Sequence, residues 1–187
     1  MYEGNNKTAR QSQKLIADAM LRLLDSLSFA DISVSSICKE ADVSRQTFYT
    51  VFGSKENVMI YELTQKCRYT PEQKKCDCRT EKLRELCAEY SGYIIENRRI
   101  MELLVRNNMM QCFYDVQYRT LTDCEHFVRD VPDRERQFIV DFIAEGISSI
   151  AKNYVLTGCT ADEAELAEII YMLFSGGYFH GGILKQL

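Results

Sequence analysis

Two short helical patterns lie three residues apart near the start of this 187-residue chain, and that spacing restricts the fold more than any other feature. Ser33 is a suitable N-cap for a helix at 34–41, and Ser44 is a suitable N-cap for a helix that continues to Val51. A longer helical pattern precedes the pair and another follows it. Two short helices joined by a tight turn in this setting predict a helix-turn-helix.

Apolar residues recur at helical spacing along most of the chain, and no segment shows the alternation that is typical of a strand. Proline occurs only twice, which permits long helices. The sequence therefore predicts an all-α fold. Outside the pair, the expected helices cover residues 8–28, 55–67 (capped by Ser54), 80–97 (capped by Thr80), 98–106, 109–130, 133–157 and 161–179, the last with a capping box of Thr160 and Glu163.

A polar segment, "RYTPEQKKCDCRT" (68–80), contains Pro71 and lacks apolar periodicity. Such a composition is typical of a connection between domains. We expect an N-terminal helix-turn-helix domain at 1–67, a linker at 68–80 and a C-terminal helical domain at 81–187.

The second helix of the pair has two chemically different faces. Phe48, Val51 and Phe52 share one face and are expected to be buried against the first helix of the chain. The other face carries side chains that can bond phosphates or bases: Ser44, Arg45, Gln46, Thr47, Tyr49 and Thr50. Arginine and glutamine have the groups that recognise guanine and adenine edges. An ordinary amphipathic surface helix explains the spacing equally well, so spacing alone leaves both interpretations open.

The residues themselves favour DNA binding. The segment "LIADAMLRLLDSLSFADISVSSICKEADVSRQTFYTVFGSKENVM" joins an apolar first helix, Phe29 before a serine-capped second helix, and the motif V-S-x-x-T-F-Y-x-x-F-x-S-K-E. Residues 15–63, about a quarter of the chain, resemble the DNA-binding domain of the TetR family of transcription regulators. The resemblance implies a homeodomain-like domain of three helices, followed by a helical domain for ligand binding and dimerisation.

The same resemblance implies roles for individual residues. Tyr49 and Lys55 match residues that hold the DNA backbone, and Ser33 and Ser44 match N-caps that meet phosphate. Arg45, Gln46 and Thr47 match positions that read bases. The expected DNA-binding set is Lys7, Thr8, Arg10, Ser33, Ser44, Arg45, Gln46, Thr47, Tyr49, Thr50 and Lys55.

Two positions depart from the family pattern. Asp42 stands where a glycine usually forms the turn, but aspartate tolerates the left-handed backbone conformation better than most residues, so we expect the turn to form. Gln46 stands where a small residue is common, which leaves the operator sequence open.

The formal charge of −4 argues against coating of nucleic acid by bulk positive charge. Residues 1–67 contain eight basic and eight acidic side chains, so DNA binding is expected to depend on a few placed contacts. The N-terminus lacks a hydrophobic signal segment and no apolar run is long enough to span a membrane. The sequence therefore predicts a cytoplasmic protein without a membrane partner.

The resemblance also implies that the C-terminal domain forms a homodimer and binds an effector. Two apolar stripes in the last two helices are the expected dimer interface: Ile139, Ile143, Ile147, Ile150, Tyr154, Leu166, Ile169, Ile170, Leu173 and Gly177. Gly177 and Gly181 either permit close helix approach or simply end the helix.

Aromatic and methionine side chains earlier in this domain suit the lining of a pocket for a small hydrophobic effector. The expected lining is Tyr90, Tyr93, Met101, Met109, Met110, Phe113, Tyr114, Phe138 and Phe142. Core packing explains any one of these residues better than a pocket does, and a partner protein in place of a small ligand remains an alternative.

Eight cysteines in a chain without a secretion signal are expected to be mostly reduced and packed like small hydrophobes. Cys76 and Cys78 lie in the expected linker beside basic residues, which favours the thiolate. Together with Cys67 and Cys87 they offer four soft ligands, but their spacing matches no standard zinc site. We expect no metal and no cofactor, with redox or metal sensing as the alternative.

Sequence motifs of hydrolases, P-loop enzymes and zinc proteases are missing, so we expect no enzymatic activity. The predicted function is that of a dimeric regulator that binds a near-palindromic double-stranded operator and represses until an effector releases it. A helical protein-interaction module, or a regulator controlled by a partner protein, is the alternative. The outward-facing Arg45, Tyr49 and Lys55 favour DNA binding over a pure scaffold.

Overall fold

The computed structural model describes residues 1–66, 80–124 and 131–177, and every regular element in these parts is a helix. The all-α prediction is confirmed. In chain order the helices are α1 (Lys7–Ser26), α2 (Val34–Ala41), α3 (Arg45–Val51), α4 (Lys55–Lys66), α5 (Thr80–Glu96), α6 (Arg98–Arg106), α7 (Met110–Asp123), α8 (Asp133–Leu156) and α9 (Glu163–Phe174).

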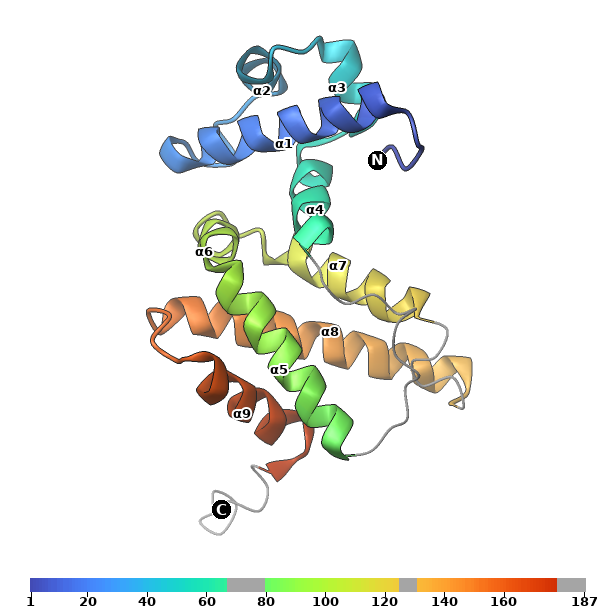
Figure 1. The fold of residues 1–187 in the computed structure, drawn as a ribbon, viewed down its shortest axis with the longest axis vertical. Helices are drawn as coiled ribbons and strands as arrows, with labels where there is room; N and C mark the ends of the chain where they lie inside the picture. The colour runs from blue at the N-terminus through green and yellow to red at the C-terminus, as the bar shows by residue number, and fades with distance from the viewer. Residues whose placement is uncertain (67–79, 125–130, 178–187) are drawn as a thin grey trace.

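The chain divides into two ends that are joined through α4 (Figure 1). Helices α1–α3, here called the head, lie at one end, and α5–α9, here called the body, lie at the other. In the body, α5 packs on α9 and α7 packs on α8, while α4 packs on both α1 and α7. The predicted linker at 68–80 lies outside the described residues except for Thr80, so the exact domain division stays a prediction.

The helix-turn-helix forms as predicted. Ser33 accepts a hydrogen bond from the Ser36 amide at the start of α2, and Ser44 accepts one from the Thr47 amide at the start of α3. Asp42 ends α2 in the left-handed conformation, with φ of 52°. The turn is closed by a hydrogen bond of 3.0 Å from the Val43 amide to the Cys38 carbonyl. An aspartate therefore supplies the conformation that glycine adopts most easily.

The apolar face of α3 is anchored in the core, as predicted. Phe48, Val51 and Phe52 have at most 2% of their surface exposed. The Phe48 and Phe52 rings pack against each other with centroids 6.2 Å apart, and Phe52 meets the edge of Tyr61 on α4. Burial of a phenylalanine side chain stabilises a fold by about 2–3 kcal/mol, so these two rings hold α3 more strongly than its own short backbone does.

The core continues from the head into the body without a break. The Tyr93 ring on α5 stacks on Phe113 of α7 at 5.9 Å between centroids. Its hydroxyl donates a hydrogen bond of 3.1 Å to the Leu63 carbonyl of α4. Because α4 packs on α1 of the head and on α7 of the body, it connects the two ends.

The predicted start of the last helix is wrong by two residues. Gly158 and Cys159 both adopt positive φ, at 84° and 56°, so the chain is still turning where Thr160 was expected to cap the helix. Asp162 is the cap instead, in a capping box with Glu165. Aspartate is as good an N-cap as threonine, and the turn decides between them.

Other helix ends differ from the prediction by small amounts. Thr80 is the first residue of α5 and not its cap, and α7 ends at Asp123, with the remainder of its predicted span outside the described residues after Cys124. Helix α9 ends at Phe174 and is followed by Gly176 with φ of 73°. A glycine thus ends this helix, although it is not Gly177. None of the described helices is long and apolar enough to cross a membrane.

We predict that Asp42→Ala lowers the free energy of unfolding by about 1 kcal/mol, because alanine tolerates the left-handed conformation poorly. Asp42 is exposed, so no packing contact confounds the comparison. Asp42→Asn is the matched control and should retain wild-type stability. Urea unfolding followed by circular dichroism measures both, and equal stability of the two variants would contradict the prediction.

Candidate nucleic-acid interface

The outward face of α3 presents polar groups that nothing else in the described structure engages. Arg45, Gln46 and Tyr49 are exposed, and half of the Tyr49 surface is accessible. The guanidinium of Arg45, the amide of Gln46 and the hydroxyl of Tyr49 make no hydrogen bond with any described residue. The Tyr49 ring rests edge-on against buried Phe48, which fixes its direction. These three groups are oriented by the core and remain available to a ligand.

The hydroxyl groups of the same helix are less available than the sequence predicts. The Ser44 and Thr47 hydroxyls bond each other at 2.8 Å. The Thr50 hydroxyl donates to the Gln46 carbonyl at 2.9 Å. Short hydroxyl side chains compete for nearby backbone and side-chain groups, and sequence spacing does not show which partner they choose. The α3 face therefore depends chiefly on Arg45, Gln46 and Tyr49.

An N-terminal arm, residues 1–6, ties α1 to the far end of α3. The Tyr2 amide donates to the carbonyl of Val51, the last residue of α3, at 2.8 Å. The Tyr2 carbonyl accepts from the side-chain amide of Gln13 on α1 at 2.9 Å, and Gln13 is only 3% exposed. Sequence reasoning missed this tie because it uses the Tyr2 backbone, which carries no residue-specific signal. A buried glutamine on an apolar face was the available clue.

The arm also places the three predicted contact residues of α1. Asn6 caps α1 by accepting from the amides of Thr8 and Ala9 at 2.9 and 3.3 Å. Arg10 donates to the Gly4 carbonyl and the Asn5 side chain, at 3.2 and 2.6 Å, so its guanidinium holds the arm in place. Lys7 and Thr8 are exposed at the start of α1. This is the end of α1 that the arm connects to α3. These residues therefore lie on the α3 side of the head.

Lys55 has an internal role that the sequence did not predict. Its ammonium donates to the carbonyls of Phe29 and Ile32, at 2.9 and 2.5 Å, and lies 4.5 Å from the centre of the Phe29 ring. The lysine thus holds the connection between α1 and α2 against the start of α4. A contact with DNA phosphate would have to use its third N–H, and that contact stays a prediction. Ser33, next to Ile32, likewise uses its hydroxyl in the α2 cap.

The residues predicted to line an effector pocket are divided between the core and the surface of the body, so the pocket stays a prediction. Tyr93, Met101, Met109 and Phe113 are buried in the core, and Tyr90, Met110 and Tyr114 are half-buried. Phe138 and Phe142, by contrast, are 69% and 68% exposed on α8. Aromatic composition alone does not distinguish the inner face of a helix from its outer face. These two phenylalanines lie on the surface of the described chain, where each borders a surface hollow.

The predicted dimer stripe is likewise divided between the interior and the surface of the chain, and the interface itself stays a prediction. Ile147 and Ile170 are buried within the chain and are not available to a partner. Ile139 and Ile143 are half-buried on α8, and Gly177 is half-buried beyond α9. One apolar stripe of each helix packs inside its own chain, because that burial stabilises the fold itself, while α9 exposes Ile169 and Leu173.

A surface hollow of about 530 Å³ lies between α8 and α9. Five residues of the predicted interface line this hollow. Ile150, Tyr154 and Leu166 are buried, and Ile169 and Leu173 are exposed. Phe142, Gly146, Ser149 and Asn153 also line it from α8. A Cβ at Gly146 would lie 3.0 Å from the Phe174 ring, so glycine permits this close approach.

The five described cysteines form no disulfide, and all but Cys159 are buried. Burial raises the pKa of Cys87 and of Cys112 to about 11. Both therefore stay protonated at neutral pH, unlike a thiolate ligand or a redox-active cysteine. Cys67, Cys76 and Cys78 lie outside the described residues. Within the described parts, no group of His, Cys, Asp and Glu is arranged to hold a metal ion.

Comparison with known proteins identifies this architecture. The sequence model for bacterial regulatory proteins of the tetR family matches residues 16–61, and the model for a transcriptional regulator C-terminal region, TetR_C_8, matches residues 81–176, about half of the chain. The chain belongs to the TetR family. It is a DNA-binding transcriptional regulator, which is not a class of enzyme.

Several known proteins are similar over nearly the whole chain. The HTH-type dhaKLM operon transcriptional activator DhaS of Lactococcus lactis subsp. lactis (strain IL1403) is 26% identical over 180 residues, which cover 91% of this chain and 93% of DhaS. Lin0861 from Listeria innocua has a similar structure, with a TM-score of 0.76, 18% identity and coverage of 94% of this chain and 95% of that chain.

NalD, the secondary repressor of the MexAB-OprM multidrug efflux pump in Pseudomonas aeruginosa, matches with a TM-score of 0.59 and 21% identity, covering 91% of this chain and 97% of NalD. DhaS is named an activator and NalD a repressor. The proteins to which this chain is similar therefore include both an activator and a repressor.

We predict that Gln13→Leu releases the N-terminal arm of this TetR-family chain, because leucine cannot donate to the Tyr2 carbonyl. The backbone amides of Tyr2 and Asn6, which are hydrogen-bonded in the arm, should then exchange with deuterium about fivefold faster, since one lost hydrogen bond contributes about 1 kcal/mol. Gln11→Leu, at an exposed position of the same helix, is the control. Unchanged exchange in Gln13→Leu would show that the tie contributes nothing.

Proposed function

We propose that this regulator binds a near-palindromic operator as a homodimer, with α3 of each subunit in the major groove. The observation that carries the proposal is the set of unengaged polar groups on α3, above a fully buried aromatic face. Arg45 and Gln46 have the donor and acceptor patterns that read guanine and adenine, and the Tyr49 hydroxyl suits a phosphate. Lys7 and Thr8 at the start of α1 suit a second phosphate contact.

Charge balance supports recognition through these few contacts. Residues 1–67 carry as many acidic as basic side chains, so no broad positive field holds the duplex. The salt dependence of binding should therefore be shallow, in proportion to the number of phosphates that are neutralised. Sequence specificity then comes mainly from α3.

The apolar surface of α8 and α9 supports dimerisation. Phe142, Ile169, Met172 and Leu173 are each at least 40% exposed and lie around or next to the hollow between the two helices. Such a cluster is unfavourable in water, and a second copy of the same face would cover it as a four-helix bundle. A dimer also doubles the number of bases read, which one short helix cannot supply.

An effector that changes the affinity for DNA completes the proposal. The body contains Gln117, 1% exposed, whose side-chain amide has no hydrogen-bond partner among the described residues. A buried amide without a partner is costly, so a small ligand with a polar group would be stabilised next to it. A cytoplasmic location suits a regulator that binds DNA and senses such a molecule.

A partner protein as the effector is the second candidate. Phe138, 69% exposed, borders a hollow with Tyr114, Tyr118, Gln137 and Asp141 on the α7 side of α8. An exposed aromatic ring beside polar groups is typical of protein interfaces.

Repression by occupying a promoter is the proposed direction of regulation, with activation as the alternative that DhaS illustrates.

Selection of bound sequences from random duplex DNA tests the DNA-binding proposal. Tyr49→Ala should weaken binding to every sequence by about tenfold, because it removes a backbone contact worth about 1–1.5 kcal/mol. Gln46→Ala should change which base is preferred at one position of each half-site. Lys55→Ala should weaken binding and stability together, because it releases the Phe29 and Ile32 carbonyls. Wild-type affinity and preference in all three variants would contradict the proposed interface.

We predict that Ile169→Glu converts the dimer to a monomer, because it places a carboxylate in the apolar face of α9. Leu15→Glu in the head is the matched control, since both side chains are 42% exposed. Sedimentation velocity at micromolar concentration measures the oligomeric state. A dimer that persists in Ile169→Glu would locate the interface elsewhere.

A further inference from the structure

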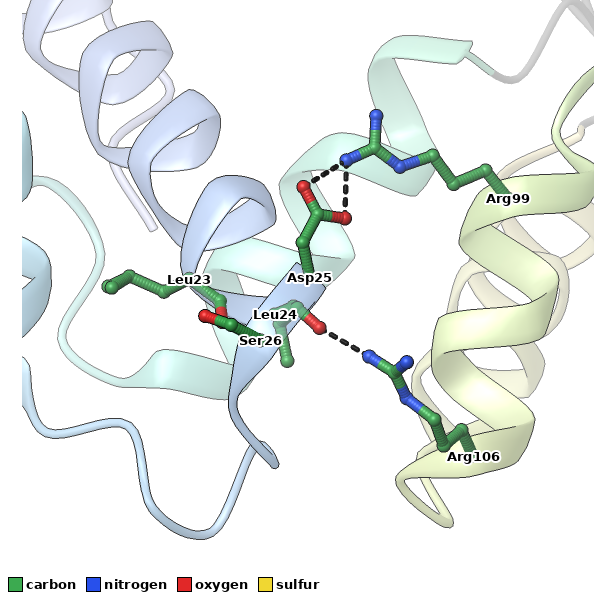
Figure 2. Close-up of polar contacts among 6 residues, drawn as sticks. All are labelled: Leu23, Leu24, Asp25, Ser26, Arg99 and Arg106. Atoms are coloured by element: carbon green, nitrogen blue, oxygen red, sulfur yellow. Dashed lines mark hydrogen bonds and ion pairs between the residues drawn. The ribbon is translucent and has the colours of Figure 1, made fainter.

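The head and the body meet at a second place besides α4, where the end of α1 lies against α6 (Figure 2). One nitrogen of the Arg99 guanidinium bonds both carboxylate oxygens of Asp25, each at 2.6 Å. Further along α6, Arg106 donates to the Leu24 carbonyl. Two arginines, seven residues apart on one side of α6, therefore contact the last turn of α1.

The last turn of α1 needs these contacts for a physical reason. A helix leaves its final carbonyl groups without partners and has a partial negative charge at that end. The last turn of α1 contains no basic residue of its own, and it contains Asp25, whose charge opposes the helix dipole. Arg106 and Arg99 supply the missing positive charge from another helix.

The connection that follows α1 is bonded both to the end of α6 and to the start of α4. The Phe29 amide donates to the Asn107 side-chain oxygen at 2.7 Å, and the Phe29 carbonyl accepts from Lys55. Asn107 in turn donates to the Leu103 carbonyl of α6 at 2.8 Å, which fixes its amide in one orientation. The Phe29 residue is thus bonded to the body through its N–H and to the start of α4 through its C=O.

The contact between α1 and α6 lies away from the axis of α4, and it therefore limits how the head can rotate relative to the body. Packing of α4 on α7 alone would leave the head able to turn about α4, because a single rod constrains rotation about its own axis weakly. The contacts of Arg106 and Asn107 lie at the opposite end of α1 from the arm that holds α3. They therefore act on the recognition helix through the full length of α1.

We propose that Arg106 and Asn107 are positioning residues that fix the angle of the head on the body, and with it the spacing between half-sites that the dimer accepts. The inference rests on the proposed dimeric binding to DNA. In a dimer the two bodies are joined, so the head angle sets the distance and rotation between the two α3 helices. One inserted base pair displaces a half-site by about 3.4 Å and about a tenth of a turn.

The Arg99–Asp25 ion pair and the hydrogen bonds of Arg106 and Asn107 contribute differently to holding the end of α1 against the body. The Arg99 and Asp25 side chains are 66% and 52% exposed, and such surface ion pairs contribute little. Arg106 is exposed as well, but it donates to a backbone carbonyl of buried Leu24, and this bond is partly shielded from water. Asn107 is half-buried. Arg106 and Asn107 should therefore control the head angle, with a minor part for Arg99.

The test compares operators whose central spacer is shortened or lengthened by one or two base pairs. Wild-type protein should bind the selected spacing about tenfold more tightly than a spacer changed by one base pair, the loss expected for a poorly seated half-site. In Arg106→Leu/Asn107→Ala that ratio should fall to about twofold, while affinity for a single half-site stays unchanged. Arg106→Gln, a milder single change that keeps a long polar side chain, should lower the ratio in the same direction.

Arg98→Leu is the matched control, because Arg98 lies on α6 and pairs with Glu102 of the same helix, and it makes no hydrogen bond or ion pair with the described residues of α1. It should retain the wild-type spacing ratio. If Arg106→Leu/Asn107→Ala and Arg106→Gln lose affinity equally for all spacers, the ratio is unchanged and the inference is overturned. Failure of the proposed function would appear differently, as wild-type protein that selects no DNA sequence at all.

Hydrogen exchange provides a readout that needs no DNA. Amides at the end of α1 and in the connection to α2, residues 24–32, should exchange faster in the double variant, while those of α3 keep wild-type protection. Unchanged exchange at residues 24–32 would overturn the inference even if DNA binding could not be measured.

Discussion

Burial of Phe48 and Phe52 beneath α3 is the interaction on which the rest of the structure depends. Helix α3 has seven residues, too few to be stable in water by itself. Its position therefore comes almost wholly from the rings that anchor it against α1 and α4. Because the apolar face of α3 is buried, the polar face with Arg45, Gln46 and Tyr49 points outward in a fixed direction.

Sequence reasoning was most successful where the signal is local. Serine caps at Ser33 and Ser44 and the left-handed Asp42 depend on neighbours a few residues away, and the structure has all three. It failed at the start of α9, where a tight turn before Asp162 displaced the cap. A capping motif is recognisable in a sequence, but the backbone path that leads into it is not.

Long-range contacts explain what sequence alone could not predict. The tie from Gln13 through Tyr2 to Val51 and the two bonds of Lys55 join residues that only the folded chain brings together. Apolar stripes such as Ile147 and Ile170 correctly indicated helices, but a stripe does not say whether its partner is the same chain or another. Here one stripe packs inside, and a second apolar face of α9, with Ile169, is exposed.

Tight coupling between elements gives the body a direct way to act on α3. The head has few internal degrees of freedom, because the arm holds one end of α1 to α3 while Lys55 holds the other end to α4. A change in the body that moves Asn107 or α4 must therefore move the head as one unit. In such an arrangement a small displacement at the Phe29 connection is carried along α1 to the outward-facing side chains of α3, so the proposed regulation needs no unfolding of this helix.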